Sequence, residues 1–108
     1  PWLSDNVMTA DQNIILYISI ANVGRFEGTE TILLFIRDEV ASVARPVKEL
    51  KSFQKVFLKP GEKKVVEFNI CIDMLKFYDK KNRFIYEPGD FTVYIGSHSC
   101  KFSLVDKI

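Results

Sequence analysis

Apolar and polar residues alternate with a period of two through most of this chain, and this alternation restricts its fold more than any other feature. In residues 13–22, every second position is apolar: Ile14, Leu16, Ile18 and Ile20. Successive side chains of a β-strand point to opposite faces, so this spacing predicts a strand with one strongly apolar face. No long stretch keeps a helical period. The chain is therefore predicted to be all-β.

The same alternation predicts further strands at residues 29–38, 63–70, 91–95 and 100–105. In the first of these, Leu33 and Phe35 make the second face apolar as well. A strand with a solvated face normally alternates to polar residues there. We therefore expect this strand to be central in its sheet or covered by another domain.

Turn residues separate the predicted strands. Pro60-Gly61 predicts a type II turn, because proline sets φ at the second turn position and glycine supplies the positive φ of the third. Pro88-Gly89 repeats this pair. Residues 72–77 offer at most one helical turn, with Asp73 as its expected cap.

About seven short strands with such turns indicate an antiparallel two-sheet β-sandwich of the immunoglobulin or fibronectin type III-like kind. The 108 residues suffice for one hydrophobic core, so residues 1–108 are predicted to form a single domain. With 47% hydrophobic and 27% charged residues, the chain is expected to fold and not to be disordered.

The net charge of +1 favours neither nucleic acid nor a membrane surface as a partner. No apolar run approaches the ~20 residues of a membrane-spanning helix. The first residues lack an initiator Met and a signal-peptide pattern, so we interpret the chain as a domain excised from a larger protein. The parent's location stays open between periplasmic, secreted and cytoplasmic.

No cofactor or metal is expected. His98 is the only histidine, and apart from the nearby Cys100 no soft ligand accompanies it. No glycine-rich stretch leads from a strand into a helix N-terminus, as a phosphate site would require. Cys71 and Cys100 leave a disulfide open, although a domain with a core of this size does not need one.

No catalytic residue is predicted, and the chain alone is not expected to be an enzyme. The candidate acids stand at predicted strand ends or turns, where exposed carboxylates are ordinary: Asp38, Glu39, Asp79, Glu87 and Asp90. Ser97-His98-Ser99 is interpreted as a polar hairpin turn, because adjacent strand residues point to opposite faces.

The aromatic residues leave a second interpretation open. Four rings fall outside the clear core positions: Trp2, Tyr78, Phe84 and Tyr86. Exposed rings of this kind would suit an autonomous carbohydrate-binding module, with weak carbohydrate contact. Nine of the fourteen aromatics are Phe, however, which lacks the polar group that favours Tyr and Trp at wet binding surfaces.

Several motifs resemble the fibronectin type III-like domain at the C-terminus of family-three glycoside hydrolases, the β-glucosidase group. They are SVARPVKELKSFQKVFLKPGEKKVVEF at residues 42–68, Asn22-Val23-Gly24, Phe77-Tyr78-Asp79 and EPGDFTV at residues 87–93. The resemblance implies a non-catalytic accessory domain that packs against and stabilises the upstream catalytic domains of the same polypeptide. It implies a retaining parent of β-glucosidase or β-xylosidase type, acting on terminal non-reducing β-linked sugars. None of the family's catalytic motifs matches a position here.

The resemblance also indicates which segment contacts those domains. The candidate docking residues are Val43, Arg45, Pro46, Lys48, Glu49 and Phe53. An arginine offers a planar fork of donors that suits a carboxylate across an interface, although the same segment is also a plausible charged loop between strands. Ser52 departs from the family, which commonly has glycine there; a positive φ would strain it by about 1 kcal/mol.

Overall fold

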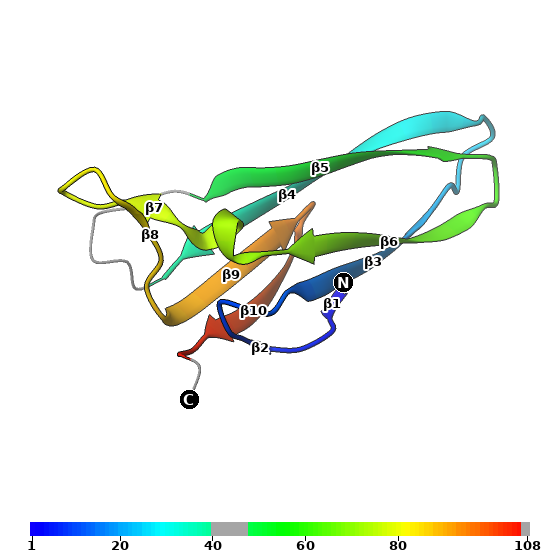
Figure 1. Ribbon diagram of the computed structural model, residues 1–108. Helices are drawn as coiled ribbons and strands as arrows, with labels where there is room; N and C mark the ends of the chain where they lie inside the picture. Colours follow the sequence, from blue (N-terminus) through cyan, green and yellow to red (C-terminus); the bar gives the residue numbers. More distant parts are fainter. Residues whose placement is uncertain (40–47, 107–108) are drawn as a thin grey trace.

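The computed structural model describes residues 1–39 and 48–106, which form a two-sheet β-sandwich (Figure 1). One sheet has the strand order β1 (Trp2–Leu3), β3 (Ile14–Ala21) and β6 (Lys63–Ile70). The other has the order β2 (Val7–Met8), β10 (His98–Leu104), β9 (Gly89–Ile95), β4 (Gly28–Asp38) and β5 (Glu49–Leu58). A separate ladder pairs β7 (Phe77–Tyr78) with β8 (Phe84–Ile85).

The all-β prediction is confirmed, and the predicted strands agree with β3, β4, β6, β9 and β10 to within two residues at each end. The structure adds strands that the alternation did not reveal. Four of the ten strands in the described part of the chain have only two residues each: β1, β2, β7 and β8. A two-residue strand is too short to show a period, so only its pairing partner identifies it.

The apolar faces of the two sheets pack against each other to form one core. Leu16 and Phe68 come from the three-stranded sheet, and Leu34, Phe91 and Val93 come from the five-stranded sheet; each is at most 1% exposed. These are the alternate positions that the sequence predicted to point inward. The interdigitation of two such faces is the usual basis of a β-sandwich.

The strand β4 lies between β9 and β5, so the prediction that it is central in its sheet is confirmed. Leu34 pairs with both Ile95 on β9 and Ser52 on β5. The register with β5 shifts after Leu34, because Phe35 is opposite Leu50 and Lys51 is left as an extra residue. Ser52 therefore lies beside a β-bulge. The positive φ considered for it is absent, since Asn82 is the only non-glycine residue with positive φ in the described ranges.

Two local predictions are wrong. Asp73 does not cap the 3-10 helix η1 (Ile72–Leu75), because it lies inside the first turn and Cys71 occupies the N-cap position; Asp73 pairs with Lys76 at 3.1 Å instead. Pro88-Gly89 does not form a turn, because Gly89 is the first residue of β9. The chain has no reason to reverse there, since β8 and β9 are not neighbours in a sheet.

The predicted turn at Pro60-Gly61 is confirmed. Gly61 has φ of +79°, and the Glu62 backbone N–H donates to the Lys59 carbonyl at 2.9 Å. The Glu62 carboxylate also accepts a hydrogen bond from the Lys59 backbone N–H at 3.0 Å. The side chain of Glu62 thus adds a second closure across the β5–β6 turn.

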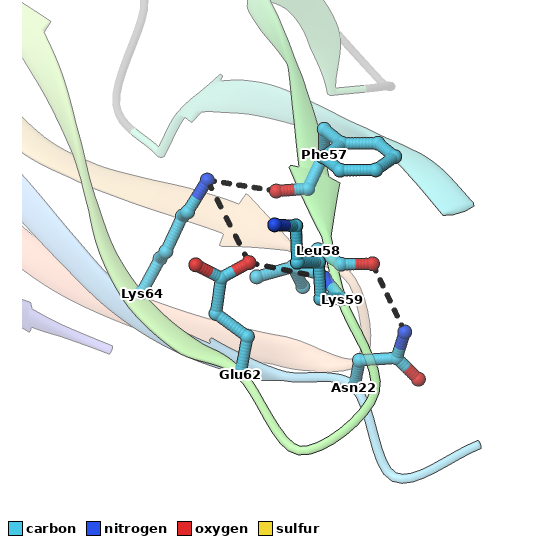
Figure 2. A network of polar contacts seen from close by, with 6 residues as sticks. All are labelled: Asn22, Phe57, Leu58, Lys59, Glu62 and Lys64. Atoms are coloured by element: carbon cyan, nitrogen blue, oxygen red, sulfur yellow. Dashed lines mark hydrogen bonds and ion pairs between the residues drawn. The ribbon is translucent and has the colours of Figure 1, made fainter. Parts of the chain in front are cut away.

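Asn22 joins this turn to the loop between β3 and β4. Its side-chain amide donates to the carbonyls of Leu58 at 3.1 Å and Phe26 at 2.8 Å, and its amide oxygen accepts from the Gly24 N–H at 2.9 Å. Figure 2 shows the Asn22–Leu58 bond beside the bonds made by Glu62 and by Lys64. The Asn22 side chain therefore ties the β3–β4 loop to the end of β5, and the Asn22 backbone bonds to Glu62 and Gly61 of the β5–β6 turn.

We predict that Asn22→Ala lowers the free energy of unfolding by about 1–2 kcal/mol, because two carbonyls and one N–H lose their partner. The exposed Asn13, just before β3, provides a matched control, and Asn13→Ala is expected to change stability by less than about 0.5 kcal/mol. Urea unfolding of both variants measures the difference. Equal effects would contradict the role given to Asn22.

Candidate docking surface

The outward face of the five-stranded sheet carries an apolar patch on β4 and β5. Leu33 lies directly opposite Phe53, and directly opposed residues of a ladder share a face. Leu50 and Phe57 lie on the same face, opposite Phe35 and Thr29. We call Leu33, Leu50, Phe53 and Phe57 the outer patch. All four are among the exposed large hydrophobic residues, with Phe53 at 59%.

Lys48 lies beside the outer patch, over two aromatic rings of β4 and β9. Its ammonium nitrogen lies 5.1 Å from the centroid of the Phe35 ring and 4.7 Å from that of Tyr94. A cation above an aromatic face is attracted by the negative ring surface. Phe35 and Tyr94 are opposite each other on β4 and β9, so Lys48 sits over the junction of these strands.

Beyond these rings the same sheet face becomes polar. Glu39 accepts a hydrogen bond from the Thr92 hydroxyl at 3.0 Å and pairs with Arg37 at 3.7 Å. Asp90 accepts from the Ser103 hydroxyl at 2.7 Å. These groups border a hollow of about 680 Å³. The structure thus brings together two of the acids considered for catalysis, and each has structural partners within the sheet.

The predicted docking residues divide into two groups. Val43, Arg45 and Pro46 lie outside the described residues, so their docking role stays a prediction. Lys48, Glu49 and Phe53 are described. Lys48 directly precedes β5, Glu49 is its first residue, and Phe53 belongs to the outer patch. Glu49 pairs with Lys51 at 3.4 Å.

The candidate docking residues named from the sequence did not include Leu33, Leu50 and Phe57 of the outer patch. The signal that could have found Leu33 was present, because β4 is apolar on both faces. Phe57 follows Phe53 by simple alternation, but Leu50 needed the β4–β5 register, since the β-bulge at Lys51 changes which residues before Phe53 point outward.

The β7–β8 hairpin carries the exposed rings of Tyr78 and Phe84. Their centroids are 4.9 Å apart and the rings are inclined by 36°. Trp2 instead stacks on Tyr17 of β3, with centroids 5.5 Å apart. These rings therefore do not form one flat platform of the kind that would suit a sugar face.

Asp79 closes the β7–β8 hairpin. Its carboxylate accepts hydrogen bonds from the backbone N–H groups of Lys81 and Arg83, both at 2.9 Å, and pairs with the Arg83 guanidinium at 2.8 Å. The hydrogen bond from the Arg83 backbone is the main cause that lowers the pKa of Asp79 below its usual value of 3.8. Asp79 is thus a structural carboxylate.

The structure describes both cysteines as free thiols. Among residues 1–39 and 48–106, no three His, Cys, Asp or Glu side chains are grouped so that they could hold a metal ion. Within the same ranges, no helix is long and apolar enough to cross a membrane.

Comparison with protein families finds a match to the fibronectin type III-like domain over residues 30–99. The chain is 41% identical over 99 residues to a periplasmic beta-glucosidase of Salmonella typhimurium and 45% identical over 100 residues to the beta-glucosidase BoGH3A of Bacteroides ovatus. Each alignment covers 92% of this chain and 13% of the relative. The chain thus spans about one eighth of the length of these relatives.

Solved structures give the same result. A β-glucosidase of Erythrobacter marinus superposes with a TM-score of 0.90 at 30% identity, covering 96% of this chain and 14% of that protein. A β-glucosidase of Listeria innocua, in complex with glucose, superposes with a TM-score of 0.86 at 30% identity, covering 92% of this chain and 14% of that protein.

We predict that Asp79 titrates below pH 3.8. A carboxylate with a lowered pKa in the folded state stabilises that state above the unfolded pKa, and this contribution is lost as the pH falls through the folded pKa. Opening of the β7–β8 hairpin should therefore increase at acid pH, and Asp79→Asn should remove that dependence. Carboxyl chemical shifts of Asp79 and amide exchange in residues 77–85 measure the two effects. A titration midpoint at or above 3.8 would contradict the prediction.

Proposed function

This chain belongs to the fibronectin type III-like domain family, and from this premise we propose that it is a non-catalytic accessory domain of a β-glucosidase-like glycoside hydrolase. It packs against the upstream catalytic domains of the same polypeptide and stabilises them. The parent hydrolyses terminal non-reducing β-linked sugars by a retaining mechanism, as an enzyme of β-glucosidase or β-xylosidase type.

The names of the relatives support the activity that we propose for the parent. Proteins from Salmonella and Bacteroides that align with this chain are named beta-glucosidases, and one from Formosa agariphila is named a putative beta-xylosidase. In each, the matched part is 13% of the protein. The remaining length is several domains' worth of chain.

The observation that carries the docking proposal is the outer patch. Four large apolar side chains exposed on one sheet face are typical of an interaction site. Its neighbours include Lys48 and Glu49, which supply the polar rim that interfaces between domains commonly have. Arg45, in the segment that joins β4 to β5, is proposed as a contact of the same interface.

The isolated domain is predicted to have no glycosidase activity. Retaining hydrolysis needs two carboxylates that face one glycosidic bond. Glu39 and Asp90 border the same hollow, but both carboxylates have structural partners within the sheet. Aryl β-glucosides and β-xylosides provide the assay, with heat-treated protein as the blank. Turnover that disappeared on substitution of one carboxylate would overturn the accessory role.

In the full-length enzyme, Phe53→Asp is predicted to lower the thermal midpoint by several degrees, because it places a charge in a buried interface. Val65→Asp is the matched control, since Val65 on β6 is 58% exposed and lies on the other sheet. Differential scanning calorimetry measures both variants. Equal thermal midpoints for the two variants would show that the outer patch is not part of the interface.

A further inference from the structure

One edge of β4 is left without a strand partner over part of its length. β4 pairs with β5 along residues 28–36, but it pairs with β9 only along residues 34–38. Figure 1 shows the β9–β10 hairpin ending midway along β4. On the β9 side of residues 28–33, no strand of the described part of the chain is paired with β4.

The register identifies the backbone groups at this edge. The Glu39 backbone N–H donates to the Asp90 carbonyl at 3.0 Å, directly beyond the β4–β9 ladder. Backbone groups of successive strand residues point to alternate sides, so the odd-numbered residues of β4 direct their N–H and C=O groups toward β9. Where β9 has ended, Thr29 and Thr31 direct these groups to an open edge.

An apolar hollow of about 510 Å³ lies beside this edge. Ile18 and Ile20 on β3 and Ile32 on β4 line it from the core side, whereas Leu33 and Phe35 line it from the outward face. Gly96, in the β9–β10 turn, closes one end. Since residues from both faces of β4 border the hollow, it spans the plane of the sheet at the place where a continuing strand would lie.

The β5 edge of the same sheet is protected. Where β5 and β6 meet, the Gln54 side-chain amide donates to the Glu67 carbonyl and the Lys64 ammonium donates to the Phe57 carbonyl at 2.8 Å. β5 also carries Lys51 and Lys55. Such side chains prevent an edge from pairing with another strand. Residues 28–33 contain neither lysine nor proline, and Glu30 is their only charge.

We propose that an extended segment of the same polypeptide, from outside residues 1–108, adds a strand to β4 at residues 29–33 and fills the hollow beside it. This rests on the proposed function, since the catalytic domains would supply the segment. Its backbone pairs with Thr29 and Thr31, and alternate apolar side chains enter the hollow. A basic residue at one end pairs with Glu30.

The occupant is a segment of the same chain for two reasons. The chain spans 13% of its Salmonella and Bacteroides relatives, so most of such a polypeptide is tethered to this domain at high effective concentration. A second copy that paired through the same edge of β4 would present the same concave hollow and the same Glu30. It would bring neither the side chains that fill the hollow nor the opposite charge.

Hydrogen exchange of the full-length protein tests the inference directly. The amides of Glu30 and Ile32 point to β5 and serve as internal references. If the edge is paired, the amides of Thr29 and Thr31 exchange as slowly as these references at every protein concentration. Exchange faster by about 100-fold or more would overturn the inference. Protection that appears only as the concentration rises would also overturn it, because the occupant would be a second copy.

Thr31→Pro gives an independent test, since it removes an N–H that makes no bond to β5. Proline is tolerated at an open edge but not within a paired strand. In the full-length protein, Thr31→Pro should lower the thermal midpoint by about 3 °C or more relative to Thr31→Val, which keeps the N–H. Equal midpoints would overturn the inference. If Phe53→Asp still destabilised the enzyme, the proposed accessory function would stand without it.

Discussion

Burial of two apolar sheet faces against each other is the interaction on which the rest of the structure depends. Leu16 and Phe68 on one sheet meet Leu34 and Val93 on the other, and all four are almost completely buried. Successive side chains of a strand point to opposite faces, so the neighbours of each core residue point outward. The character of both outer faces is therefore decided at the same positions that build the core.

The unequal lengths of the strands explain why the two edges of the sandwich differ. β4 and β5 form a long ribbon whose far end Asn22 ties to the β3–β4 loop, while the β9–β10 hairpin stops midway along β4. The hollow beside β4 lies at the same end as this tie, bordered by Ala21 and Leu58, because the hairpin does not extend along residues 28–33. Side chains cover the seam between β5 and β6, whereas residues 28–33 of β4 have no strand partner on the β9 side in the described part of the chain.

Most of the fold was predictable from the sequence, because β3, β4, β6, β9 and β10 each bury alternate residues. The failures share a cause. Pro88-Gly89 and Asp73 have the composition of a turn and a cap, but whether the chain reverses or a helix begins depends on which elements become neighbours. Of the candidate docking residues, Phe53 lies in the outer patch and Lys48 lies over the rings of Phe35 and Tyr94, while their docking role stays a prediction.

The sequence by itself determined the all-β class, the inward residues of the long strands and the turn at Gly61, because periodicity and turn chemistry are local properties. Its motifs also indicated the domain family. Only the tertiary structure decided how Leu33, Leu50, Phe53 and Phe57 gather on one face, because the register and the bulge at Lys51 set that arrangement. It also decided that β4 keeps an open edge, since a strand's missing partner is a property of the sheet and leaves no mark on the strand's own residues.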